Sequence, residues 1–155
     1  MPAVTLKKTY ITRKGLEKLK SEYQFLTGPA RSQTARRIKD AREDGEVEEN
    51  LEYKAALQEW DLLENRVSEL ELLLKCAVTV EKRRSTKVEV GSTVFVEAEG
   101  ERFDLTLVGS EEVDPAKGLI SYESLVGEAL LGTKPGDTVI VSCSIKTTYK
   151  IIAIK

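Results

Sequence analysis

The chain has 155 residues, of which 41% are hydrophobic and 32% are charged, and its 24 basic and 26 acidic side chains give a formal net charge of −2. It has no histidine, which excludes imidazole catalysis and every metal site that needs that ligand. Its two cysteines, Cys76 and Cys143, are far apart and argue against a disulfide framework or a zinc knuckle. No apolar run approaches membrane-spanning length, and the first residues lack the apolar core of a signal peptide, so we expect a cytoplasmic protein with no membrane partner.

The first half of the chain has the apolar spacing of two helices. The first helix is expected to follow Thr12 as its N-cap, with apolar positions at Leu16, Leu19, Tyr23, Leu26, Ala30, Thr34, Ile38 and Ala41. The spacing shifts just after Gly28-Pro29, and a proline inside a helix removes a hydrogen bond, so we expect a bend near residue 28 and a seam that resumes on a rotated face. The second helix alternates spacings of three and four, at Tyr53, Ala56, Trp60, Leu63, Val67, Leu70, Leu74 and Ala77.

A short acidic segment over residues 43–50 joins these two helices. Gly45 is a residue that can turn the chain, and a short connection forces the helices it joins to lie antiparallel. Each arm of roughly 30 residues would be about 45 Å long at a rise of about 1.5 Å per residue. We therefore predict an antiparallel coiled-coil hairpin over residues 1–80, with an acidic tip at residues 43–50.

The second half has the pattern of a small α+β domain. Strands are expected over residues 88–97, 103–108, 138–143 and 148–154, with one short helix over 124–131. The polar, aperiodic residues 81–87 are interpreted as a hinge, so a second domain is predicted over residues 81–155. The predicted fold class is α+β, a long helical hairpin followed by a sheet with one helix packed on it. Both cysteines are expected to be small buried hydrophobic residues.

Charge is unevenly distributed along the predicted hairpin. Residues 31–42 carry Arg31, Arg36, Arg37, Lys39 and Arg42 against the single acid Asp40, whereas residues 43–52 carry Glu43, Asp44, Glu46, Glu48, Glu49 and Glu52 with no base. Two interpretations are open. Acids in the first turn of a helix complement its dipole, and basic residues on a helical arm commonly form a solvated face. Carboxylates without a basic neighbour also suit Mg²⁺, provided that a substrate or a partner completes its coordination.

Short motifs follow one another along almost the whole chain. They are Thr12-x-x-Gly15-Leu16-x-x-Leu19, Arg37-Ile38-x-x-Ala41-Arg42, Gly45-x-x-x-Glu49-Asn50-x-Glu52-Tyr53, Gly91-Ser92-x-Val94, the stretch from Leu107 to Pro115, and Ala129-Leu130-Leu131-Gly132 before Gly136-Asp137. In this order and spacing the chain resembles the bacterial Gre transcript cleavage factors, closest to their GreA branch. The resemblance implies an FKBP-like globular domain that docks on RNA polymerase. It also implies a hairpin that enters the secondary channel of the polymerase.

The resemblance also implies roles for particular residues. Glu46 and Glu49 match the two tip acids that act in trans, holding a Mg²⁺ shared with the polymerase while its active site cleaves backtracked RNA near the 3′ end. An RNA-contacting basic patch is implied at Arg36, Arg37, Lys39 and Arg42, and polymerase docking residues at Asp114, Pro115, Ser121 and Ser124. The implied protein is a monomeric, DNA-binding transcription factor, not an enzyme by itself. Its partners are RNA polymerase and the nascent RNA 3′ end, and it binds no cofactor alone.

The tip departs from the family pattern. Where the family has Gly-Asp-Leu-Ser-Glu-Asn, this chain has Gly45-Glu46-Val47-Glu48-Glu49-Asn50, so its first acid is one methylene longer and a glutamate replaces the serine. Ser124-Leu125 also stands where the family often has Ser-Pro, in the docking loop. Because of the altered tip at Glu46 and Glu48, the alternative function is a channel binder that modulates or inhibits the polymerase without stimulating cleavage. A coiled-coil dimeriser is disfavoured, because the hairpin already pairs both seams.

Overall fold

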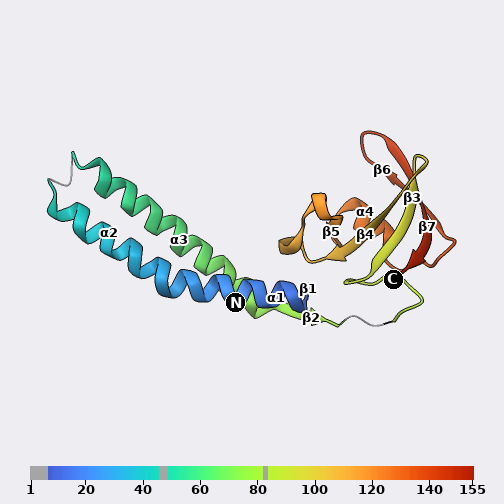
Figure 1. Cartoon of the computed structure of the whole chain (residues 1–155), viewed down its shortest axis with the longest axis horizontal. Helices are drawn as coiled ribbons and strands as arrows, with labels where there is room; N and C mark the ends of the chain where they lie inside the picture. Colours follow the sequence, from blue (N-terminus) through green and yellow to red (C-terminus); the bar gives the residue numbers. More distant parts are fainter. Residues whose placement is uncertain (1–6, 46–48, 82–83) are drawn as a thin grey trace, which may run out of the picture. The chain divides into compact units, whose positions relative to one another are not determined.

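The computed structural model describes residues 7–45, 49–81 and 84–155, and Figure 1 shows the course of the chain. By its internal contacts the chain forms two compact units. The hairpin unit is Glu17–Cys76, and the globular unit comprises the described residues up to Leu16 together with Ala77–Lys155. The boundary that the sequence suggests, between residues 80 and 81, stays a prediction. Within the described ranges, no helix is long and apolar enough to cross a membrane.

The hairpin unit has two helical arms, as predicted. The first arm contains α1 (Arg13–Phe25), whose first turn lies in the globular unit, the π-helical turn η1 (Leu26–Ala30) and α2 (Arg31–Glu43). The second arm is α3 (Leu51–Cys76), which runs back beside α2 (Figure 1). The helix ends one residue earlier than the apolar spacing indicates, because Ala77 is the first residue of a strand.

The predicted irregularity near residue 28 is the π-helical turn η1, which contains Pro29. Proline has no N–H to donate and its ring crowds the carbonyl four residues earlier, so the helix widens here instead of continuing with α geometry. A π-turn holds one extra residue, and that extra residue accounts for the repeated spacing of four from Leu26 to Ile38. Leu19 before the turn and Thr34 after it are both buried, so the turn absorbs the offset in the seam.

The seam of the hairpin is built from the residues that the spacing predicts. Its buried members are Leu19, Thr34 and Ala41 in the first arm and Ala56, Leu63, Val67 and Leu70 in α3. Thr34 is the polar exception, and its hydroxyl donates a hydrogen bond to the Ala30 carbonyl at 3.0 Å. A buried hydroxyl that is paired in this way carries little penalty.

Ion pairs join the two arms along the edges of this seam. The guanidinium of Arg66 binds both carboxylate oxygens of Glu22 at 2.7 and 3.0 Å, and this hydrogen bond holds the pKa of Glu22 below its ordinary value. Arg31 binds Glu64 in the same bidentate way at 2.9 and 3.0 Å. Such pairs add little stability at a surface, but their geometry favours one register of the arms over its alternatives.

The globular unit is a five-stranded sheet with one helix, which confirms the predicted α+β class. Its strands are β3 (Thr93–Ala98), β4 (Glu101–Val108), β5 (Leu119–Ser121), β6 (Thr138–Ser142) and β7 (Lys146–Ile154), in the order β5-β4-β3-β7-β6. Only β4 and β5 pair in parallel among these strands. The buried core is Val88, Val94, Val96, Leu105, Leu107, Ile151 and, from helix α4 (Leu125–Leu130), Leu130. Cys143 was predicted to be buried but is exposed, because it lies in the bend between β6 and β7, whereas Cys76 is half-buried.

A second, two-stranded sheet was not predicted. Strands β1 (Thr9–Thr12) and β2 (Ala77–Val80) pair in parallel, with Thr9 opposite Ala77 and Thr12 opposite Val80. In the sequence, β1 directly precedes α1 and β2 directly follows α3. Each strand has only four residues, the shortest run over which alternation can mark a strand in sequence.

The first turn of α1 is fixed inside the globular unit. Thr12 is its N-cap, as predicted, and accepts a hydrogen bond from the Gly15 N–H at 3.1 Å. The Glu112 carboxylate, at the end of the 3₁₀ turn η2 (Ser110–Glu112), accepts from the Thr12 N–H at 3.1 Å, from the Gly109 N–H at 3.0 Å and from the Thr12 hydroxyl. A Cβ at position 15 would overlap this carboxyl group, so only glycine fits there without displacing it.

Candidate functional site at the hairpin tip

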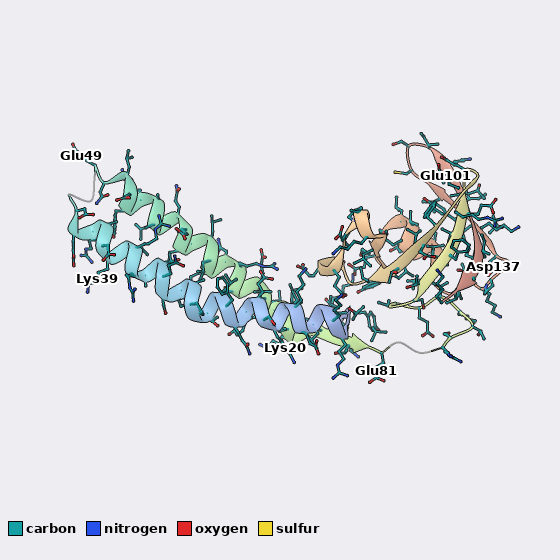
Figure 2. The ribbon with its side chains drawn as sticks, in the orientation of Figure 1. Lys20, Lys39, Glu49, Glu81, Glu101 and Asp137 are labelled. Carbon is teal, nitrogen blue, oxygen red and sulfur yellow. The ribbon has the colours of Figure 1, made fainter. Side chains whose placement is uncertain are left out.

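The tip of the hairpin is strongly acidic and exposed. Helix α2 ends at Glu43 and α3 begins at Leu51, and the described residues between them are Asp44, Gly45, Glu49 and Asn50. Glu49 is exposed and lies at the end of the hairpin, as Figure 2 shows. The predicted site residue Glu46 and its neighbour Glu48 lie outside the described residues. Gly45 does not adopt a positive φ.

Asn50 organises the chain next to Glu49. Its side-chain oxygen accepts the Tyr53 N–H at 3.0 Å, which makes Asn50 the N-cap of α3. Its side-chain amide donates to the Ala41 carbonyl in the last turn of α2. Sequence reasoning assigned no role to Asn50, although an asparagine directly before a helical pattern is a recognised start signal.

The described acids do not form a metal site by themselves. Within residues 7–45, 49–81 and 84–155 there is no group of three or more cysteine, aspartate or glutamate side chains arranged to hold an ion. Mg²⁺ takes about six oxygen ligands and keeps several waters. An exposed carboxylate such as Glu49 can therefore add an oxygen ligand only to an ion whose other ligands come from a partner.

The predicted basic patch divides into two kinds of residue. Arg37 is engaged inside the hairpin, where its guanidinium pairs with Glu59 of α3. Arg36, Lys39 and Arg42 are exposed, and among the described residues no ion pair occupies their charged groups. Lys39 points away from the hairpin in Figure 2. Three of the four cations are therefore available to a ligand, while Arg37 has a structural partner.

The predicted docking residues lie around strand β5 of the globular unit. Asp114 forms a bridge with Leu119 through two backbone hydrogen bonds of 3.0 Å, and Pro115 begins the exposed 3₁₀ turn η3 (Pro115–Lys117). Ser124 caps α4 by accepting the Gly127 N–H at 3.0 Å, and its hydroxyl donates to the Ser121 carbonyl at 2.6 Å. The two serines are thus brought together, and both have a structural task.

A polar cluster beside these serines had no sequence signal. The Glu123 carboxylate accepts from Lys7 at 2.8 Å and from the Ser110 hydroxyl at 3.0 Å. The Lys7 hydrogen bond is the main reason that the pKa of Glu123 is lowered, with Ser110 second. These residues are separated by more than ten positions in the chain, and periodicity carries no information about such a pairing.

Known proteins resemble the chain over both of its parts. A family model described as "Transcription elongation factor, N-terminal" matches residues 9–78, and one described as "Transcription elongation factor, GreA/GreB, C-term" matches residues 83–155. The transcription elongation factor GreA of Thermomicrobium roseum is 44% identical over 132 residues, covering 83% of this chain and 85% of that protein. The GreA of Caldanaerobacter subterraneus is 40% identical over 139 residues, covering 87% and 88%.

Among solved structures, the GreA factor homolog 1 (Gfh1) of Thermus thermophilus is 25% identical and covers 96% of this chain and 99% of its own, with a TM-score of 0.46. At that TM-score the structural likeness adds nothing to the assignment. The two family models together span nearly all of the described chain, and the curated relatives exceed 30% identity over most of its length. The chain belongs to the GreA/GreB family of transcription elongation factors.

Proposed function

We propose that this protein enters the secondary channel of RNA polymerase and stimulates the cleavage of backtracked RNA by the polymerase. The observation that carries the proposal is an exposed carboxylate, Glu49, at the end of a helical hairpin in a chain of the GreA/GreB family. The GreA proteins of Thermomicrobium roseum and Caldanaerobacter subterraneus are named transcription elongation factors, which supports RNA polymerase as the partner. The protein acts as a monomeric accessory factor in the cytoplasm and completes a site that belongs to the polymerase.

The proposed chemistry assigns one task to the tip acids. Glu49, together with Glu46, adds carboxylate oxygens to a Mg²⁺ held mainly by the polymerase. When bound, that ion supplies an activated water and stabilises the charge on the scissile phosphate. Glu49 contributes by binding and orientation, because an exposed side chain at a helix end reaches into a partner without rearrangement of the hairpin.

The basic flank has a supporting task in this proposal. Arg36, Lys39 and Arg42, which have no ion-pair partner among the described residues, contact phosphates of the displaced RNA 3′ segment beside the acidic tip. Arg37 contributes less, since it must leave Glu59 before it binds a phosphate. The globular unit docks on the polymerase through the region of Asp114, Pro115, Ser121 and Ser124. The DNA-binding character implied by the family resemblance stays a prediction.

The experiment is an RNA-cleavage assay on a stalled, backtracked elongation complex, with and without the protein. Glu49→Gln removes one charge at the tip and keeps the size of the side chain, and we expect stimulated cleavage to fall by about 100-fold or more. Asp61→Asn is the matched control, because it neutralises an exposed acid on α3 away from the tip. Competition with a labelled wild-type protein measures binding, which both variants should retain.

Two outcomes contradict the proposal. If Glu49→Gln and Asp61→Asn stimulate cleavage equally, the Glu49 carboxylate has no role in the cleavage reaction. If the wild-type protein slows elongation and never raises cleavage above that of the polymerase alone, the channel-blocking alternative applies. The sequence feature behind that alternative is the pair Glu46 and Glu48, which stand where the family has aspartate and serine.

A further inference from the structure

Asn50 makes more hydrogen bonds than a helix cap requires. Its side-chain oxygen accepts the Tyr53 N–H at 3.0 Å, and its backbone carbonyl accepts the Lys54 N–H at 3.1 Å. Both of these bonds belong to the start of α3. A third bond, from its side-chain amide to the Ala41 carbonyl, leaves α3 and reaches the other arm.

The Ala41 carbonyl is a fixed point in the hairpin. Ala41 is only 7% exposed and lies in the seam between the arms. Its carbonyl also accepts the N–H of Asp44, the C-cap of α2, at 3.3 Å. The end of α2 and the start of α3 are therefore both bonded to the carbonyl of one buried residue, and Asn50 provides the link from α3.

Glu49 depends on this link for its position. Within the described part of the chain, no hydrogen bond or ion pair holds its carboxylate. Its neighbour Asn50 is half-buried and hydrogen-bonded through three atoms, so on this side Glu49 is held through the peptide bond that joins it to Asn50. A change in the hydrogen bonds of Asn50 therefore shifts the backbone of Glu49 directly.

We infer that Asn50 is a positioning residue, which places Glu49 for metal binding by bridging the two helix ends across the tip. The inference rests on the proposed function, because the position of Glu49 matters to cleavage only if its carboxylate binds the shared ion. Asn50 does not touch the reacting atoms in this role. Its two side-chain hydrogen bonds can be removed separately. The bond to the Ala41 carbonyl, called the bridge, is assigned to positioning, and the bond from the Tyr53 N–H is the helix cap.

Two substitutions separate the bridge from the cap. Asn50→Asp keeps the shape and the oxygen that accepts the Tyr53 N–H, but it replaces the donor that faces the Ala41 carbonyl with an acceptor. Asn50→Ser keeps a cap of good quality, carries no added charge and is too short to reach Ala41. Since both serine and aspartate are strong N-caps, the helical content and the melting temperature of the hairpin should stay close to those of the wild type.

The test is the cleavage assay at increasing concentrations of factor and of Mg²⁺. A displacement of about 1 Å can cost about 100-fold in rate, so we expect at least about a 10-fold lower rate at saturating factor for both variants. The factor concentration for half-maximal stimulation should change by less than about twofold, because the docking surface is untouched. The Mg²⁺ concentration needed for half-maximal cleavage should rise.

Val67→Ala is the control for a merely structural effect. It shortens a buried seam residue, 3% exposed and about 25 Å from Asn50 along α3, so it lowers the melting temperature without altering the tip. We expect it to cleave at the wild-type rate, with the wild-type Mg²⁺ dependence, below its melting temperature. A loss of rate in Val67→Ala equal to that in the Asn50 variants would overturn the inference, because general loosening of the hairpin would then explain both.

Glu49→Gln in the same assay distinguishes the two claims. If Glu49→Gln is inactive while Asn50→Ser and Asn50→Asp cleave at the wild-type rate, the proposed function stands and the positioning role is wrong. If Glu49→Gln itself cleaves normally, the proposed function fails first. The proposed function and the positioning role are both supported if all three variants lose rate, fold like the wild type and need more Mg²⁺ for half-maximal cleavage.

Discussion

The two halves of the hairpin unit are stabilised in different ways. In the half near the tip the buried seam residues are small, namely Thr34, Ala41 and Ala56, whereas the other half buries Leu19, Leu63, Val67 and Leu70. Apolar burial contributes about 25 cal/mol per Å², so the leucine-rich half gains more from its seam. Small seam residues leave room for the helices to approach closely. Polar links join the arms in both halves, through Asn50 and the Arg37–Glu59 pair near the tip and through the Arg31–Glu64 and Glu22–Arg66 pairs in the other half. The smaller and the larger fully buried side chains are thus placed in different halves of one hairpin.

The largest expected effect is in the leucine-rich half. Leu70 is fully buried, and Leu70→Ala should lower the free energy of unfolding of the hairpin by about 2–5 kcal/mol, through lost burial and a cavity. Leu72→Ala, at a position of the same helix that is 52% exposed, is the control and should change it by less than about 0.5 kcal/mol. Urea denaturation followed by circular dichroism at 222 nm measures both. Similar losses in the two variants would contradict the assignment of the core to this face.

A smaller effect is expected from enlarging a buried seam residue in the half near the tip. Ala56 is 1% exposed, and Ala56→Leu should force α2 and α3 apart at a cost of about 1–3 kcal/mol in the free energy of unfolding. Ala55→Leu introduces the same side chain at the exposed neighbouring position and should be nearly neutral. The same denaturation experiment compares them. If Ala56→Leu proves as stable as Ala55→Leu, then this half has room to spare and its small residues do not define a close approach.

The smallest effect concerns the ion pair between Glu22 and Arg66 and its pH dependence. The Arg66 hydrogen bond lowers the pKa of Glu22 in the folded state, so the unfolded chain binds a proton there more readily. The contribution is therefore complete above the ordinary glutamate pKa near 4.5 and is lost as the pH falls through the lower folded value. Because the pair is partly exposed, we expect a contribution of at most about 1 kcal/mol.

Comparison of Glu22→Gln with the wild type in urea at pH 7 and pH 3 measures this contribution. The difference between the two proteins should be present at pH 7 and should shrink toward zero at the lower pH. A difference that is the same at both pH values would show that the substitution acts through packing rather than through the charge of Glu22.

Sequence periodicity was sufficient for the hairpin because its seam is a local, repeated signal. The spacing around Gly28-Pro29 indicated an irregularity, which is the π-turn, and Thr12 was identified as a cap from its residue type and position. The strands that were missed, β1, β2 and β5, have three or four residues each and lack a repeat. Cys143 was wrongly expected to be buried, because the apolar run before it continues into a bend that faces solvent.

The candidate site was only partly accessible from sequence. The charge pattern identified the acidic tip and its basic flank, since runs of like charge are visible without a structure. Arg37 is ion-paired, unlike Arg36 and Lys39 among the described residues, because it meets Glu59, which is twenty-two positions away in the sequence and lies on the other arm. The link from Asn50 to Ala41 likewise needs the spatial proximity of two helix ends. Pairings across an interface are set by packing, which no single run of residues encodes.

Because Thr12 and the first turn of α1 are hydrogen-bonded within the globular unit, the N-terminal family match and the compact hairpin unit have different bounds. The family model for the N-terminal part covers residues 9–78, and so includes Thr12, Gly15 and the strand β1. By contacts, however, these residues belong with the globular unit, where Glu112 accepts hydrogen bonds from the N–H and the hydroxyl of Thr12. A fragment cut at Glu17 would lose the cap and first turn of its own helix, and a fragment that starts at Thr9 would carry donors whose acceptor stays behind. The segment that the N-terminal family model matches is therefore longer than the segment that packs as the hairpin, and a transplanted hairpin needs either Glu112 or a new acceptor in its place.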